Sequence, residues 1–563
     1  MQSLIQYRRA AVAAQLHVKS RLLRSNASSS RSSDEHTVTG RIDTSFETSD
    51  PRSCHEAVTQ TQAIANTRDV VAGSSNSSLA ESNEQGTLAG DHEKSEQFFI
   101  VGWSGNDDSL YPRNWSTPRR LGVLLQLSLV TVVLTAASSV DSVVIPQAAR
   151  ALHVSEVAES VATTLFLVGM GLGCLIAAPF SETFGRNPVY CVSIAVSMIL
   201  IMASGLAPNF GAQITFRFLA GFSASTPLVC TGGSVADMFS RAEKTWSYPL
   251  LAIFGFAGPM LGPVIGAYIG PSTVISWRWV EWTMLIGTAA TLVVLLLCMP
   301  ETYSPVLLQW KASHCRKLTG DARFRSQHEA VGGTLVSRLK VSMTRPFLML
   351  AEPIVMVMTL YLTVVYIILF TFLVGWPHIF EFTYGISQGL SNTIFVAMII
   401  GNFANFFMLP VIYHKTLRHL QKQPEQAFRP EIRLLWGTLG AAIALPVSLF
   451  WLAWTNYAYL SIWCAILAVG LFGFGLGGIF VCVYMYIIDS YEVYSASALT
   501  FVTLVRYVVA GGMTVVGIPF YGNEGTHLTL TILASIAAVL VPALYGLHYF
   551  GHLIRAKSKY AVS

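Results

Sequence analysis

The chain has 563 residues, of which 53% are hydrophobic and 12% are charged, and its mean hydropathy is +0.52. Soluble globular domains carry roughly 45–50% apolar and about 25% charged residues, so this composition excludes an ordinary soluble protein. The net charge of +5 does not indicate nucleic-acid binding, because the basic residues lie in tails and loops between apolar runs.

Residues 1–119 are rich in Ser, Thr, Asn and charge, and they predict a mostly disordered cytosolic tail. Such a stretch buries too little apolar area to offset the entropy lost on ordering. The first 33 residues contain several arginines and no acidic residue, a composition that transit peptides share. A basic cytosolic tail is the favoured interpretation, because no sufficiently apolar run precedes residue 121.

From residue 121 onward, apolar runs of about 20 residues recur, and each is long enough to cross the roughly 30 Å hydrocarbon core as a helix. They predict an all-α polytopic membrane protein with twelve transmembrane helices, although eleven or thirteen remain alternatives. The expected spans are 121–144, 158–180, 188–207, 211–234, 247–270, 279–299, 350–374, 389–413, 433–455, 460–488, 497–519 and 527–550.

The distribution of Lys and Arg predicts the orientation of these helices. The even-numbered gaps between spans are basic, whereas the odd-numbered gaps hold only Arg150 and Arg278, so the even gaps and both termini are expected in the cytosol. The acidic gap 489–496 is the exception.

The longest internal gap, 300–349, divides six spans from six. We therefore expect an N-terminal six-helix bundle at 120–299, a cytosolic linker at 300–349, a C-terminal six-helix bundle at 350–550 and a cytosolic tail at 551–563. Two such bundles with a substrate path between them are typical of transporters built from parallel repeats.

The end of the second span combines small residues with charge. Glu182 and Arg186 are four residues apart at the cytosolic membrane edge, Gly185 lies between them, and Asp237 follows the fourth span on the same side. These residues predict a latch between helices that breaks when the conformation changes. Simple anchoring at the membrane edge is the alternative.

Arg217 lies inside the fourth apolar run, where a cation must be solvated by a cavity or paired with a carboxylate. Asp141, near the outer end of the first span, is the candidate partner at a similar depth. Two interpretations stay open: a residue that tunes a proton site or contacts substrate, or a fixed buried ion pair.

The fifth span repeats Gly-Pro within one helix, which removes backbone hydrogen bonds and bends it. Glycines spaced by four share one helix face and allow a second helix to approach closely. This pattern predicts a bent, tightly sealed helix with a conformational role, with a packing kink as the alternative. The residues are Gly255, Gly258, Pro259, Gly262, Pro263 and Gly266.

Arg506 is a second cation within an apolar run, the eleventh. It could line the central cavity and bind an anionic or polar group, or it could be the buried partner of Asp489 or another acid. Glu352 and Asp489 lie at cytosolic helix ends and are expected to be gate or capping residues. Aromatic side chains could stack on substrate, although most are expected to serve packing; the candidates are Tyr361, Tyr366, Trp376, Trp451, Tyr484 and Tyr486.

These motifs resemble those of the major facilitator superfamily, specifically its fungal drug:proton antiporter branch with twelve spans. The similar stretches are Pro179 to Arg186, Arg217 to Gly221, Gly255 to Gly266, Trp103 to Asp108, Pro112 to Ser116, Trp277 to Trp279, Pro300 to Ala312, Arg345 to Phe347, Glu352 to Pro353, and Tyr486 to Tyr491. Two positions depart from that pattern: Cys174 stands where relatives often have proline, and Asn187 replaces a basic residue.

The resemblance implies export of drugs, toxins or secondary metabolites against inward proton flow, by a monomer in the plasma membrane. A vacuolar or other endomembrane is the alternative location. Rival interpretations are a polyamine or other small-solute carrier on the same fold, and a non-transporting membrane sensor.

We expect a small-molecule substrate, protons and the lipid bilayer as partners, and no enzyme activity, nucleic acid, metal or cofactor. Residues 473–478 fit Gly-x-Gly-x-x-Gly, but they lie in an apolar run without a preceding soluble strand. No Walker-type phosphate loop occurs, and none of the eight cysteines forms a Cys-x-x-Cys pair.

Overall fold

The computed structural model describes residues 2–15, 18, 98–105, 108–330, 335–422 and 429–561. The chain divides into two units, Met1–His17 with Phe98–Ser563, and Val18–Gln97. Apart from Val18, the second unit lies outside the described residues, as does most of the expected tail at 1–119.

Long apolar helices make up the N-terminal half, as the apolar runs predict. Side-chain caps fix two of the helix starts: Ser155 accepts a hydrogen bond from the Ala158 N–H at 3.1 Å, and Asn209 accepts one from the Ala212 N–H at 2.9 Å. The helices are α3 (Thr117–Ala136), α4 (Ile145–Leu152), α5 (Glu156–Phe184), α6 (Arg186–Gly205), α7 (Phe210–Ala224), α8 (Thr226–Met238), α9 (Lys244–Gly266) and α10 (Trp279–Cys298), with the short η3 (Val140–Val143) after α3.

The C-terminal half repeats this construction with more irregular helices. Its main elements are α14 (Pro353–Val374), η5 (Pro377–Glu381), α15 (Phe382–Tyr384), α16 (Gln388–Thr393), α17 (Phe395–Ala404), η6 (Asn405–Met408), α18 (Leu409–Lys422), η7 (Pro430–Leu434), η8 (Gly437–Ala441), α19 (Ala442–Thr455), α20 (Ile462–Tyr491), η9 (Glu492–Tyr494) and α21 (Ser495–Ala556).

Ten helices in the described part of the chain are long and apolar enough to cross a membrane. Two departures explain the difference from the expected twelve. The fourth span is divided into α7 and α8, because Pro227 lacks the N–H that a continuous helix would need there. The last two spans form the single element α21, which is kinked at Gly525 with φ 75°. The helix count is therefore roughly consistent with the prediction.

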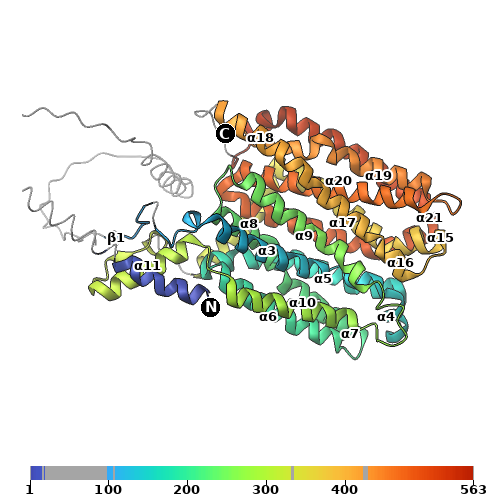
Figure 1. Cartoon of the computed structure of the whole chain (residues 1–563), viewed down its shortest axis with the longest axis horizontal. Helices are drawn as coiled ribbons and strands as arrows, with labels where there is room; N and C mark the ends of the chain where they lie inside the picture. Colours follow the sequence, from blue (N-terminus) through green and yellow to red (C-terminus); the bar gives the residue numbers. More distant parts are fainter. Residues whose placement is uncertain are drawn as a thin grey trace, which may run out of the picture. The chain divides into compact units, whose positions relative to one another are not determined.

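The two halves meet along two pairs of helices: α5 packs on α21, and α9 packs on α17. In Figure 1, α9 lies between α3 of its own half and α17 of the other half. The N and C marks lie at the same end of the long helices in that view.

The segment between the halves is largely helical, with α11 (Ser304–Thr319), α12 (Gln327–Ala330) and α13 (Leu335–Leu348). Strand β2 (Phe324–Arg325) pairs in parallel with β1 (Phe99–Ile100). Lys311 of α11 is fully buried, and its ammonium group lies 2.9 Å from an Asp108 carboxylate oxygen. The chain before the first span is thus held against the linker.

Parts of the segment expected to be a mostly disordered tail have defined structure. Residues 2–15 form a helix, in which the Gln6 side chain donates to the Glu301 carbonyl at 3.0 Å and accepts from the Glu301 N–H at 2.8 Å. Tyr7 contacts Trp310 edge-on. These partners lie about 295 positions away in sequence, so local composition could not predict the ordering.

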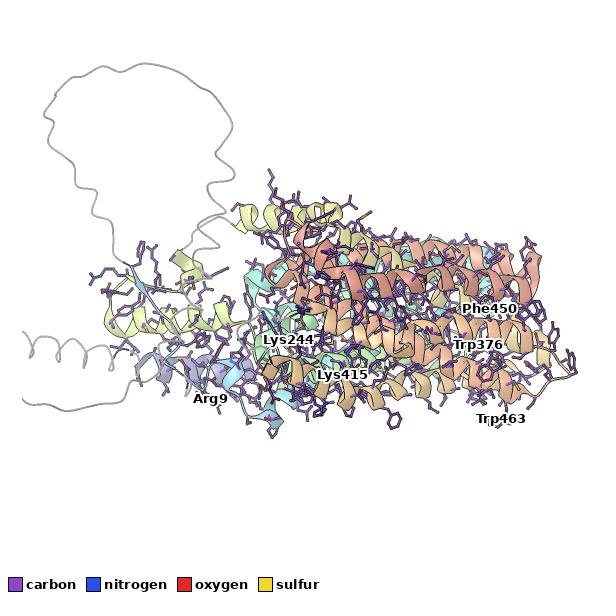
Figure 2. The ribbon with its side chains drawn as sticks, turned by 90° about the horizontal axis from the view of Figure 1, so that it is seen from above. Arg9, Lys244, Trp376, Lys415, Phe450 and Trp463 are labelled. Atoms are coloured by element: carbon purple, nitrogen blue, oxygen red, sulfur yellow. The ribbon has the colours of Figure 1, made fainter. Side chains whose placement is uncertain are left out.

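The ends of the bundle differ in side-chain character. Figure 2 shows Arg9, Lys244 and Lys415 toward one end and Trp376 and Trp463 toward the other. The cytosolic location of the end that holds these cations stays a prediction from the basic gaps.

Candidate functional site: a buried charge cluster and a central cavity

Arg217 of α7 is buried, with 1% of its surface exposed, and it contacts two carboxylates. Its guanidinium forms ion pairs with Asp141 of η3 and with Glu281 of α10, where Nε lies 2.9 Å from Oε1. Nη1 also donates to the Ala137 carbonyl at 3.1 Å. The structure therefore places Arg217 beside Asp141 and adds Glu281, which the sequence analysis missed.

A third buried acid lies close to this charge cluster of Arg217, Asp141 and Glu281. Glu159 of α5 accepts a hydrogen bond from Gln213 at 2.8 Å, while Glu281 accepts one from Ser204 at 2.9 Å. With both acids of the cluster ionised, its three charges sum to one negative charge in a water-poor site. Such an excess charge is costly to bury, so uptake of a proton is a chemistry this arrangement supports.

Helix α9 packs closely against α3 through the predicted glycine face. A Cβ atom on Gly258 would lie 2.6 Å from the Val132 carbonyl oxygen, and one on Gly262 would lie 2.7 Å from that of Ala136. At Gly266 the nearest atoms would be 3.5 Å away, so the tight contact ends before that residue.

Proline determines one polar contact between these helices. Pro259 has no N–H, so the carbonyl of Gly255, four residues earlier, loses its partner within the helix. Thr135 of α3 donates its hydroxyl to that carbonyl at 3.0 Å. Pro263 lies one turn further along the same helix. The Gly-Pro repeat thus joins α9 to α3 by both shape and hydrogen bonding.

A central cavity of about 40 Å³ lies between the halves, lined by α3, α8 and α9 on one side and by α14, α20 and α21 on the other. Its lining includes the hydroxyls of Thr131, Thr135 and Thr231 and the aromatic side chains of Tyr366 and Tyr484. Since α3 carries Thr135 toward the cavity and ends near Asp141, one helix connects the cavity to the charge cluster.

Arg506 of α21 carries the one charge among the described residues that line this cavity. The structure excludes Asp489 as its partner, because Asp489 pairs with Arg433 at 2.6 Å. Arg506 lines the cavity and forms no ion pair among the described residues, and the binding of an anionic or polar group by it stays a prediction. Tyr366 and Tyr484 lie beneath its guanidinium, with ring centres 4.5 and 5.2 Å from Cζ.

Hydrogen bonds and an ion pair join the halves at the end that holds the basic loops. Arg433, in η7, donates to the Thr245 hydroxyl at 2.6 Å and to the Arg241 carbonyl at 3.2 Å, besides pairing with Asp489. Arg241 forms a further ion pair with Glu492. Asp489 thus holds, within its own half, the arginine that bonds to the other half. The sequence analysis did not single out Arg433, which is the first residue of the expected span 433–455.

Arg186 pairs with Asp237, with Nε 3.5 Å from Oδ2, and it donates to the Ser181 hydroxyl at 2.5 Å. Its guanidinium lies 5.0 Å from the centre of the Tyr303 ring. Glu182 is half-buried and forms no ion pair among the residues that the structure describes. The latch geometry therefore rests on Arg186 and Asp237.

The buried carboxylate of Glu301 caps the start of α6. It accepts hydrogen bonds from the N–H groups of Arg186 at 2.9 Å, Asn187 at 3.1 Å and Tyr303 at 2.8 Å. Burial raises the pKa of Glu301, although these N–H donors oppose that rise. Gly185 has φ 98°, and a Cβ atom there would lie 2.6 Å from Glu301 Oε2. Glycine is therefore required at this turn for two reasons.

The hydrogen bonds that Glu352 accepts come from residues of its own half. It accepts hydrogen bonds from the Tyr491 hydroxyl at 3.2 Å, from the Ser558 hydroxyl, and from the Lys559 N–H at 3.2 Å. These contacts hold the segment that follows α21. Helix α21 itself continues to Ala556, beyond residue 551, where the tail was expected to begin. The gate or capping role expected for Glu352 stays a prediction.

The opposite end of the interface between halves has its own contacts and a larger cavity. Gln147 donates to the Gln388 side chain at 2.9 Å, and Gln388 donates to the Val143 carbonyl. An outer pocket of about 310 Å³ is lined by Ser142, Gln388 and Trp376, among others. No cluster of three or more His, Cys, Asp or Glu side chains suited to a metal ion occurs within the described ranges.

Comparison with known proteins identifies related sequences and folds. Residues 127–515 match the family description Major Facilitator Superfamily. The chain is 48% identical to the MFS-type transporter kojT of Aspergillus flavus over 465 residues, covering 82% of each chain. It is 30% identical over 469 residues to the ascochitine biosynthesis cluster MFS transporter of Didymella fabae, covering 82% of this chain and 89% of the relative.

A solved structure shares the fold. It is the proton:xylose symporter XylE from E. coli, bound to 6-bromo-6-deoxy-D-glucose, with a TM-score of 0.55 and 14% identity. The match covers 77% of this chain and 97% of the symporter.

Proposed function

The chain belongs to the Major Facilitator Superfamily and is a multi-pass membrane protein with a transporter fold, and from that premise we propose that it exports small organic compounds in exchange for protons. Its cargo is a drug, a toxin or a secondary metabolite. The name of the Didymella fabae relative, which refers to a biosynthesis cluster, supports a product of biosynthesis as cargo. The export direction fits placement in the plasma membrane, where one copy of the chain would act alone.

The observation that carries the proton coupling is the buried pairing of Arg217 with both Asp141 and Glu281. Two acids share one base, so a proton can bind without leaving Arg217 unpaired. Binding of that proton would loosen one ion pair and change how η3 and α10 are held against α7. The conformation would then depend on protonation.

This change can reach the cargo cavity through α3. Arg217 holds the Ala137 carbonyl at the end of α3, while Thr135, two residues earlier, lines the cavity and binds the Gly255 carbonyl of α9. A shift of α3 therefore alters the cavity and the tight α3–α9 contact together. Contacts between the halves at both ends support an alternating opening of this cavity.

The charge of the cavity bears on the rival functions. A polyamine carrier needs acids to neutralise its cationic cargo, but the described cavity lining holds Arg506 and no Asp or Glu. The cavity therefore favours neutral or anionic cargo. A membrane sensor would share the charge cluster, and it differs from a transporter only in producing no solute flux.

Comparing yeast cells with and without the protein on a panel of toxins, at two external pH values, tests the proposal. The protein should raise resistance, and more so at acidic pH, where the inward proton gradient is larger. Arg217→Ala should reach the membrane and lose the pH-dependent part. Equal sensitivity of both strains to every compound, with the protein present at the cell surface, would contradict transport.

A further inference from the structure

Arg506 stands apart from the other buried arginines because it has no carboxylate partner among the described residues. Arg217 pairs with Glu281, Arg433 with Asp489, and Arg555 with Glu431. Arg506 is 1% exposed, and its Nε and Nη1 atoms are buried without a hydrogen-bond partner. Burying an unpaired cation costs free energy, and an anion bound beside it would offset that cost.

Aromatic rings partly compensate for this missing partner. The guanidinium Cζ lies 4.5 Å from the ring centre of Tyr366, 4.9 Å from Tyr507, 5.2 Å from Tyr484 and 5.3 Å from Phe480. Cation–π contacts stabilise the charge through the ring faces. The Tyr484 hydroxyl also hydrogen-bonds the guanidinium, but the N–H groups at Nε and Nη1 have no acceptor among the described residues and stay available to a ligand.

The same side chain lines the cavity that separates the two halves. Across the cavity, Thr131 and Thr135 of α3 offer hydroxyls, and Tyr248 of α9 offers a ring that lies nearly parallel to that of Tyr484, with interplanar angle 20°. The present volume of about 40 Å³ has room for only a few water molecules, so the halves must separate to admit cargo.

We propose that Arg506 binds an ionised acidic group of the cargo, a carboxylate or the oxyanion of an acidic enol or phenol, with the flat body of the cargo between the tyrosine rings. This deepens the proposed function and rests on it. The forked guanidinium matches two oxygen atoms of a carboxylate. The surrounding rings favour a planar, conjugated acid over an aliphatic one.

Binding to the purified full-length protein in lipid nanodiscs tests the subsite with matched pairs of probes. The pairs are cinnamate with cinnamamide and benzoate with benzamide, which differ in charge but hardly in shape. At neutral pH the acid should bind at least about tenfold more tightly than its amide, as expected for a charge-assisted hydrogen bond. Equal binding of acid and amide to wild-type protein would overturn the proposal without any variant.

Two variants test whether the preference for the acid over its amide comes from the Arg506 side chain. Arg506→Gln should remove the preference for the acid and leave amide binding unchanged, while Arg506→Lys should restore part of it. Chloride distinguishes an inorganic anion site: if chloride stabilises the protein and cinnamate does not compete with it, the site is not one for organic acids. If Arg506→Gln does not purify as a monodisperse protein, the affinities of acid and amide for the wild type and for Arg506→Lys still test the proposal.

A flux measurement separates this inference from the proposed function. Liposomes containing the protein should move cinnamate when a pH gradient is imposed. If cinnamate binds through Arg506 but no compound moves, the transport proposal fails and the subsite stands. If toxin export is pH-dependent but Arg506→Gln exports acids as wild type does, the subsite fails and the transport proposal stands.

Discussion

Arg433 donates a hydrogen bond of 2.6 Å to the hydroxyl of Thr245, and the two residues belong to different halves of the molecule. Arg433 is fully buried, and its charge is balanced by Asp489 of its own half. A single side chain therefore joins the start of α9 to the end of α20. This contact lies at the end of the bundle where the basic loops gather.

Replacing Arg433 by Gln should favour opening at this end, because it leaves Asp489 without its cation and weakens the bond to Thr245. Breaking a buried pair in this way costs about 3–5 kcal/mol. Spin labels at Ser240 and Arg429, in a background without native cysteines, should show longer distances in the variant. The exposed pair of Arg241 and Glu492 provides the control, since Glu492→Gln should change the distances little.

Apolar run length predicted most of the long helices, since a run of about 20 residues is a local property. The break between α7 and α8 also has a local cause, Pro227, but the length of an apolar run does not reveal it. By contrast, the order of residues 2–15 depends on Gln6 meeting Glu301, which no local pattern reveals.

Glu281→Gln should abolish pH-dependent resistance while the protein still reaches the membrane. In this variant Arg217 keeps Asp141 as partner, so the cluster is neutral without a proton. Resistance assays at two external pH values, with compounds that the wild type exports, provide the measurement. Glu524→Gln is the matched control, because Glu524 is exposed and lies far along the chain at the outer turn of α21. Unchanged pH dependence in Glu281→Gln would remove Glu281 from the coupling mechanism.

The sequence identified Arg217 because a cation inside an apolar run stands out, and it placed Asp141 at a similar depth. Glu281 was missed because it lies two residues into its span and resembles an ordinary residue of a helix end. Arg433 was missed for the same reason at the start of another span. Depth can be read from a single helix, but the partner across the bundle depends on how helices are rotated, and that is set by packing.

Gly258→Ala should destabilise the protein, because its methyl group would approach the Val132 carbonyl oxygen to 2.6 Å and the α3–α9 contact would have to open. Overpacking of this kind costs about 1–3 kcal/mol. Gly512→Ala is the control, since a Cβ atom there meets nothing within 4 Å and alanine is the better helix former. Thermal unfolding in detergent should therefore show a lower Tm for Gly258→Ala and an equal or higher Tm for Gly512→Ala.

Removing one partner of the buried Asp108–Lys311 pair should destabilise the attachment of the N-terminal segment to the linker, and the effect should depend on pH. Lys311 also donates to the Gly102 carbonyl at 3.1 Å and the Ser104 hydroxyl at 2.8 Å. Burial alone would raise the pKa of Asp108, but the hydrogen bond from Lys311 and the N–H groups of Ser104 and Leu110 outweigh it, so the pKa is lowered.

A carboxyl group whose pKa is lower in the folded state stabilises that state above its unfolded pKa of about 3.9. The stabilisation is lost as pH falls through the lowered folded value. Protease cleavage between residues 98 and 119 should therefore be faster in Asp108→Asn than in wild type at pH 7, and the difference should shrink below about pH 4. An acid-stable protease gives the measurement at low pH, and Asp321→Asn, whose pairing with Arg323 is exposed, should leave the rate unchanged. If the difference in cleavage rate between Asp108→Asn and wild type stays constant down to pH 2, the pair stabilises the attachment through packing rather than through charge.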